Sequence, residues 1–188
     1  QRMITAPICE FVRRYRYSGA LRMHMPGHKG TALLGPEPLD LTEIEGADVL
    51  YHAEGIIRES EENAAALFGT KKTVYSAEGS SLCIRAMLYL AMLYARAQHK
   101  KPVIAAGRNA HKVFMTAAAL LDLDIRWIYG TESVISCAIT PAQLEDVILA
   151  EDPAAVYITS PDYLGNIADI RSLSAVCKKH GVLLLVDN

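Results

Sequence analysis

The sequence predicts an α/β protein: a three-layer αβα architecture with a mainly parallel sheet. From residue 73 onward, short apolar runs alternate with helical stretches, which is typical of strands joined by crossover helices. Runs such as Val182–Val186 are continuously apolar, as expected for strands buried on both faces. Thr140 and Pro141 form an N-cap and first-turn pair between two such runs. Parallel strands end at one edge of the sheet, where ligands bind.

The chain begins with a helix and a Gly/Pro-rich loop, Leu21–Pro38, before the alternation starts. Glycines at 69 and 181 follow two apolar periodic stretches and predict where those helices end. The predicted helices are Pro7–Tyr17, Gly55–Phe68, Ser80–Ala97, His111–Leu121, Pro141–Ala150 and Ser172–His180. The predicted strands are Thr73–Ser76, Val103–Ala106, Ile125–Tyr129, Ala155–Thr159 and Val182–Val186.

Composition excludes several functional classes. The 188 residues are 51% hydrophobic with a net charge of −2, which gives no basic surface for nucleic acid or an anionic membrane. The most apolar run, Ala86–Ala95, is too short to span a bilayer, and the first residues lack a secretory leader pattern. The four cysteines have neither paired nor metal-ligand spacing, so we expect reduced thiols in or near the core, no metal site and a cytoplasmic location.

The stretch TVYSAEGSS predicts a strand, a glycine turn and a helix whose first turn carries Ser80 and Ser81. Free backbone N–H groups and the helix dipole at such a helix start favour an anion, so Gly79, Ser80 and Ser81 are candidates for holding a phosphate. The alternative is a plain serine N-cap after a turn glycine. Neither the spacing of a Walker loop nor that of a dinucleotide-binding GxGxxG fingerprint is present, which disfavours a dinucleotide-binding domain.

Other polar residues follow the predicted strands. His111 could stack on a flat ligand or transfer protons, or it could be a solvent-exposed helix start. Asp187 ends a buried strand, so its carboxylate needs a cationic ligand or, alternatively, backbone N–H donors. The segment Ser160–Gly165 is either part of the site or an ordinary turn. A phosphate cradle, a ring stacker and a buried carboxylate together suit a flat phosphorylated heteroaromatic with a basic ring nitrogen, and pyridoxal 5'-phosphate is such a molecule.

Six motifs in order resemble the pyridoxal-phosphate-dependent ornithine/lysine/arginine decarboxylase family, in its short form. They are HMPGHKG, GII with a helix ending in LFG, AEGSS, RNAHK, SPDYLGNIADI and LLLVDN, and the resemblance extends from about Pro7 to Asn188. It implies an aspartate-aminotransferase-like (fold type I) architecture. Residues 1–50 would form an N-terminal helix and loop arm. Residues 51–188 would form the cofactor-binding large domain, incomplete at its C-terminal end.

The resemblance also implies roles for individual residues. Gly79, Ser80 and Ser81 would bind the cofactor phosphate, His111 would stack on its ring, and Asp187 would pair with the ring nitrogen and keep it protonated. We count His111 and Asp187 as the candidate catalytic residues. His24, His28 and Lys29 match an N-terminal loop of the family and receive no chemical step. Asp162 departs from the family, which usually has a small hydroxyl residue there, so a loop contact is in question.

The family's lysine that binds the cofactor covalently would lie well beyond Asn188. We therefore expect decarboxylation of arginine, lysine or ornithine to the amine, in polyamine biosynthesis, by a longer homodimeric protein, and no turnover by this chain alone. The alternative is a non-catalytic truncated homologue that acts as a binding or oligomerisation module. The lysines at 29, 71, 72, 100, 101, 112, 178 and 179 do not match the cofactor-binding position.

Overall fold

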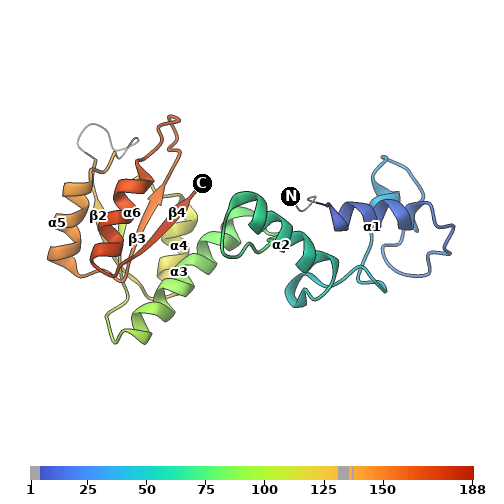
Figure 1. The fold of residues 1–188 in the computed structure, drawn as a ribbon, viewed down its shortest axis with the longest axis horizontal. Coiled ribbons are helices and arrows are strands. Elements are labelled where there is room, and N and C mark those ends of the chain that lie inside the picture. The colour runs from blue at the N-terminus through green and yellow to red at the C-terminus, as the bar shows by residue number, and fades with distance from the viewer. Residues whose placement is uncertain (1–4, 131–135, 137) are drawn as a thin grey trace. The chain divides into compact units, whose positions relative to one another are not determined.

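The computed structural model describes residues 5–130, 136 and 138–188 (Figure 1). The chain divides into two compact units, with the division between Tyr75 and Ser76. The predicted boundary between an arm, 1–50, and a cofactor-binding domain, 51–188, concerns function and stays a prediction.

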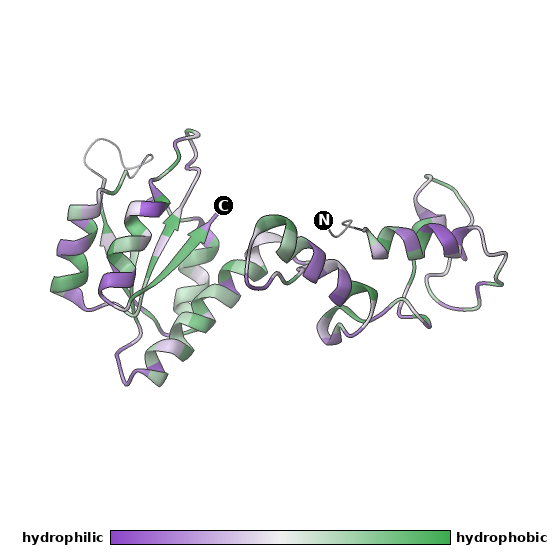
Figure 2. Cartoon of the chain, viewed as in Figure 1, coloured by the Kyte–Doolittle hydropathy of each residue, from purple (hydrophilic) through white to green (hydrophobic). Residues whose placement is uncertain are grey.

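The C-terminal unit contains a four-stranded sheet in which every neighbouring pair is parallel, in the order β2-β1-β3-β4. The register places Thr159 of β3 opposite Asp187 of β4, so both strands reach the same edge with their carboxyl ends. Hydrophobic residues run along β3 and β4 (Figure 2). The strands are β1 (Val103–Gly107), β2 (Asp124–Ile128), β3 (Ala155–Thr159) and β4 (Leu183–Asp187).

Two helices cover each face of this sheet, which confirms the predicted three-layer αβα fold. On one face, apolar side chains of α3 (Gly79–Ala97) and α4 (Lys112–Leu120) pack against β1 and β3, with Phe114 and Tyr157 fully buried. On the other face, α5 (Pro141–Glu151) and α6 (Ile170–Lys179) pack against the alternate residues of the same strands. β1 and β3 are covered on both faces and need apolar side chains in both directions, which explains their continuous apolar runs. β4, predicted to be buried in the same way, is only partly buried because it lies at the edge of this sheet.

The N-terminal unit contains α1 (Pro7–Arg16) and α2 (Ile56–Phe68), joined by loops with two short 3₁₀ helices, Glu37–Leu39 and Leu50–His52. Asp48 holds the start of α2. Its carboxylate accepts hydrogen bonds from the backbone N–H groups of four residues, over 2.8–3.1 Å. The four donors to Asp48 are Val49, Glu54, Gly55 and Ile57. At the other end of α2, Gly69 ends the helix with a φ of 65°, as its position in the sequence predicts.

The predicted strand Thr73–Ser76 is wrong. The segment has the sequence pattern of a strand but forms none, and the hydrogen bonds of Tyr75 go to residues of α2 instead of a neighbouring strand. The backbone N–H of Tyr75 donates to Glu61 Oε1 at 2.8 Å, and its hydroxyl lies 2.8 Å from Ser60 Oγ. A strand requires a ladder partner, which a local pattern does not reveal.

The other predicted elements are present with ends shifted by up to two residues. The cysteine prediction is partly wrong. Cys177 is a buried thiol whose pKa burial raises to about 11, but Cys9 and Cys83 lie on exposed parts of helices. The fourth cysteine, Cys137, lies outside the described residues. No helix in the described part of the chain is long and apolar enough to cross a membrane.

Candidate functional site

A cavity of about 210 Å³ in the C-terminal unit brings three predicted site residues together. Ser80 comes from the first turn of α3, His111 from the start of α4 and Asp187 from the end of β4. Elements far apart in the sequence converge here because the carboxyl ends of parallel strands share one edge. The lining residues are Ser80, Ile84, His111, Thr159, Pro161, Asp162, Tyr163, Asp187 and Asn188.

The start of α3 is suited to bind an anion. Gly79 has a φ of 64°, in the left-handed region that favours glycine, so the predicted glycine turn is confirmed. No side chain caps α3, whereas α4, α5 and α6 each have a side-chain N-cap. The serines therefore do not act as plain N-caps, and the first-turn N–H groups of α3 keep their capacity to bind an anion. Ser80 lines the cavity; Gly79 and Ser81, its neighbours in sequence, are not among its described lining residues.

His111 is fixed by the helix that it starts. Its Nδ1 accepts a hydrogen bond from the backbone N–H of Val113 at 3.2 Å, which makes His111 the N-cap of α4. An accepting Nδ1 carries no proton, so the neutral ring has its hydrogen on Nε2. The ring is partly buried and lines the cavity, unlike the solvent-exposed helix start that the sequence left open.

Asp187 has a partner that sequence reasoning missed. The hydroxyl of Tyr157 donates a hydrogen bond of 2.7 Å to Asp187 Oδ2. Burial of Tyr157, together with the carboxylate beside it, raises the pKa of its hydroxyl far above the usual range, so this group stays protonated. Within the described part of the chain no backbone N–H donates to this carboxylate, so the alternative of a carboxylate held by the next turn is not what the structure shows.

Thr159 is a second residue that sequence reasoning missed. It lines the cavity with a buried Oγ1 that makes no hydrogen bond of good geometry among the described residues, although it interacts with the nearby hydroxyl of Tyr157. A buried hydroxyl without such a bond is costly, so a polar ligand group in the cavity would satisfy it. The local sequence signal was only that this residue ends an apolar strand.

The segment Ser160–Gly165 is a turn organised by Asp162. The nearly buried Asp162 accepts backbone hydrogen bonds from Leu164 and Asn166, at 2.8 and 2.9 Å, and one from the side-chain amide of Asn166 at 3.0 Å. Hydrogen bonding by the Asn166 side chain, followed by the backbone donors, lowers the pKa of Asp162. Asp162 thus has a structural role at the wall of the cavity.

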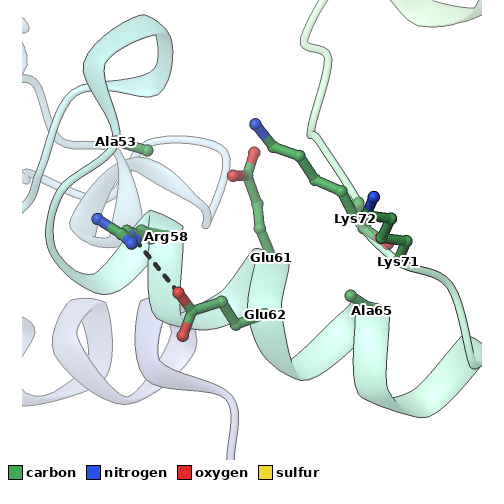
Figure 3. A pocket seen from close by; sticks show the side chains of 8 residues that line it. Ala53, Arg58, Glu61, Glu62, Ala65, Lys71 and Lys72 are labelled. Atoms are coloured by element: carbon green, nitrogen blue, oxygen red, sulfur yellow. Dashed lines mark hydrogen bonds and ion pairs between the residues drawn. The ribbon is translucent and has the colours of Figure 1, made fainter.

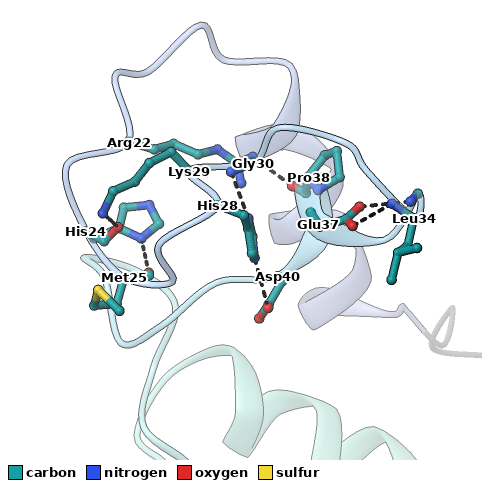
Figure 4. Close-up of polar contacts among 11 residues, drawn as sticks. Arg22, His24, Met25, His28, Lys29, Gly30, Leu34, Glu37, Pro38 and Asp40 are labelled. Atoms are coloured by element: carbon teal, nitrogen blue, oxygen red, sulfur yellow. Dashed lines mark hydrogen bonds and ion pairs between the residues drawn. The ribbon is translucent and has the colours of Figure 1, made fainter.

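The HMPGHKG loop lies in the N-terminal unit and is held by contacts within that unit (Figure 4). His24 Nε2 lies 2.7 Å from the hydroxyl of Tyr15, and the other ring nitrogen contacts the Met25 carbonyl. His28 Nε2 lies 3.2 Å from Asp40 Oδ2. These contacts account for the conformation of the loop, and none of them indicates a chemical step.

A larger cavity, about 840 Å³, lies between α2 and residues 71–73 of the N-terminal unit (Figure 3). Its lining is charged, and Arg58 forms an ion pair of 3.2 Å with Glu62 inside it. It contains none of the predicted site residues, so size alone does not identify the functional site. Lys71 and Lys72 line it, whereas the described lining of the smaller cavity includes no lysine. Among the described residues, no group of three or more potential ligands is arranged to hold a metal ion.

Comparison with protein families gives one match that extends over residues 6–188, to the model "Orn/Lys/Arg decarboxylase, major domain". The chain belongs to the Orn/Lys/Arg decarboxylase family. Among curated relatives, the arginine decarboxylase of Bacillus subtilis (strain 168) is 30% identical over 196 residues, covering 96% of this chain and 39% of the relative. The chain thus spans about two fifths of the length of the arginine decarboxylases that it matches.

Solved structures confirm the fold predicted for this family member. The SepCysS structure, solved in a complex with the SepCysE N-terminal domain, has a TM-score of 0.58 at 18% identity, covering 69% of this chain and 35% of that one. The structure of Oryza sativa TDC with PLP and tryptamine has a TM-score of 0.50 at 20% identity, covering 58% of this chain and 26% of that one. At these identities the likeness concerns the aspartate-aminotransferase-like (fold type I) architecture alone.

Proposed function

We propose that the cavity at the edge of the sheet binds pyridoxal 5'-phosphate, and that the whole protein decarboxylates arginine, lysine or ornithine to the amine. The observation that carries this proposal is the convergence of Ser80, His111 and Asp187 on one cavity. The family match and the relatives named arginine decarboxylase support it. The rice TDC structure of the same fold, crystallised with PLP, supports the choice of cofactor.

The residues present fit this cofactor. The uncapped start of α3 and the Ser80 hydroxyl suit the phosphate, and the partly buried His111 ring suits the face of a flat heterocycle. The carboxylate of Asp187 suits a protonated ring nitrogen, because an adjacent negative charge favours the charged form of the ring. The buried Thr159 Oγ1, which makes no hydrogen bond of good geometry among the described residues, suits a polar substituent of the ring.

The chain's own contribution is binding and orientation. When bound, the cofactor supplies an electron-withdrawing ring that accepts the electron pair left when the substrate loses carbon dioxide. Asp187 holds the proton on the ring nitrogen, which increases that capacity. His111, oriented by its helix cap, restricts the tilt of the ring, and Ser80 fixes its phosphate end. We further propose that the whole protein is a cytoplasmic homodimer that acts in polyamine biosynthesis.

Cofactor binding to the 188-residue chain tests the site directly. Trp127 is the single tryptophan and lies in the C-terminal unit, so its fluorescence reports a ligand that absorbs nearby. We expect pyridoxal phosphate to quench Trp127, and Ser80→Ala combined with Ser81→Ala to weaken its binding at least about tenfold. Pyridoxal, which lacks the phosphate, is the matched control and should bind the two proteins equally. Equal binding of both ligands to the unchanged chain would contradict the phosphate assignment.

Carbon dioxide release tests the reaction in the whole protein. Carboxyl-labelled arginine, lysine and ornithine should release labelled carbon dioxide, and Asp187→Ala should abolish most of this release. Ligand binding without release from any of the three would favour the alternative of a non-catalytic binding or oligomerisation module.

A further inference from the structure

Tyr157 is unusual among the residues near the cavity, because it is a polar residue in the most deeply buried part of the sheet. It has no exposed surface, and its ring packs against Phe114 with a centroid distance of 4.4 Å. Its hydroxyl nevertheless reaches Asp187, which lines the cavity, and donates the 2.7 Å hydrogen bond to it. A phenylalanine would fill the same apolar space, so packing alone does not account for the hydroxyl.

The hydrogen bond distinguishes the two oxygens of the Asp187 carboxylate. Oδ2 accepts from Tyr157, and Oδ1 has no hydrogen bond within the described part of the chain. A hydrogen bond between a hydroxyl and an ionised carboxylate is charge-assisted and restricts the rotation of the carboxylate. The rigid ring of Tyr157 is itself fixed between α4 and the sheet, so the restriction is passed on to Asp187.

We propose that Tyr157 is a positioning residue: it holds Asp187 Oδ2 so that Oδ1 binds the protonated ring nitrogen of pyridoxal phosphate. This inference rests on the proposed function, since it needs a ligand with a ring nitrogen in the cavity. It predicts that removal of the buried Tyr157 hydroxyl lowers the affinity for a ligand with a ring nitrogen more than the affinity for the same ligand with a carbon in that place.

The test compares Tyr157→Phe with the unchanged chain, using two ligands. The first ligand is pyridoxal phosphate, and the second is its deaza analogue, in which the ring nitrogen is replaced by a carbon. We expect Tyr157→Phe to weaken binding of pyridoxal phosphate about tenfold, which corresponds to ~1.4 kcal/mol. Binding of the deaza analogue should change by less than about twofold, because that ligand makes no hydrogen bond to Asp187.

Tyr94→Phe is the matched control. Tyr94 lies in the same unit, outside the described cavity lining, and its hydroxyl also makes a hydrogen bond of 2.8 Å, to the Gly181 carbonyl. We expect no change in either affinity. A ligand-free readout uses the ¹³C resonance of the Asp187 carboxylate, which should move in Tyr157→Phe but not in Tyr94→Phe.

The outcomes separate the two proposals. If the unchanged chain does not bind pyridoxal phosphate, the proposed function fails and this inference fails with it. If the unchanged chain binds and Asp187→Asn weakens binding, but Tyr157→Phe does not, only the positioning role is overturned. Equal losses for both ligands in Tyr157→Phe, or equal losses in Tyr94→Phe, would also overturn it, because they would indicate a general loss of structure.

Discussion

Phe114 connects the stability of the C-terminal unit to the geometry of the cavity, and Phe114→Leu tests that connection. Its ring is fully buried and lies 4.4 Å from the ring of Tyr157 and 5.8 Å from that of Trp127, measured between centroids. Each aromatic pair contributes about 0.5–1.5 kcal/mol beyond the area it buries. Leucine keeps most of the apolar volume but loses both pairs, so we expect the free energy of unfolding to fall by about 1–3 kcal/mol.

Urea unfolding followed by Trp127 fluorescence measures this loss in the C-terminal unit, where the single tryptophan lies. Leu144→Ala is the control, because Leu144 is equally buried but packs on the opposite face of the sheet. Its expected loss of about 2–5 kcal/mol is as large or larger. Of the two variants, only Phe114→Leu removes a neighbour of Tyr157.

Ligand affinity then separates stability from positioning. At temperatures where both variants are folded, we expect Phe114→Leu to weaken pyridoxal phosphate binding and Leu144→Ala to leave it unchanged. A loss of unfolding free energy below about 0.5 kcal/mol in Phe114→Leu would refute the energetic argument, since it is the lower limit for a single aromatic pair. Equal weakening of ligand binding by both variants would refute the argument that Phe114 affects the cavity through its contact with Tyr157.

Two further predictions concern helix starts. Burial opposes ionisation of Asp48, but its four backbone N–H donors outweigh it and hold the pKa well below the usual range. Asp48 therefore contributes stability that is fully present above about pH 4 and is lost as the pH falls through the lowered pKa. The protection of residues 49–57 from hydrogen exchange should decrease over this pH range. In Asp48→Asn this dependence of protection on acid pH should be absent. Thr140→Ala, which removes the acceptor for the Gln143 N–H, should cost about 1 kcal/mol in urea unfolding of the C-terminal unit, and an unchanged midpoint would contradict its role as N-cap.

The alternation of strands and helices could be predicted because the backbone N–H and C=O groups of each element form hydrogen bonds within a helix or in the regular ladder of a sheet. The continuous apolar run of β3 is a consequence of burial on both faces, and the cap of α5 at Thr140 is a consequence of unpaired N–H groups. The similar run of β4 lies at the edge of the sheet, where its residues are only partly buried. The segment Thr73–Ser76 was mispredicted for the converse reason. Its β-branched and aromatic residues fit a strand, but Glu61 of α2 takes the hydrogen bond that a neighbouring strand would need.

Some residues of the candidate site could likewise be predicted from their place in the order of elements, whereas others depend on contacts between distant parts of the chain. Ser80, His111 and Asp187 were found because each follows or starts an element at the carboxyl edge, a property that the order of elements determines. Tyr157 was missed because its contact with Asp187 spans 30 residues and depends on the register of two strands.

That register explains how a tyrosine at this position holds Asp187 from within the core. Thr159 pairs with Asp187 across β3 and β4, and Tyr157, two residues earlier, shares its face of the sheet. From there a side chain must be long enough to reach the end of the neighbouring strand, apolar enough to pack against Phe114, and able to donate a hydrogen bond at its tip. Serine and threonine are too short and phenylalanine has no donor, so tyrosine meets all three conditions. The buried sheet and the cavity thus share one side chain, whose ring belongs to the core and whose hydroxyl belongs to the site.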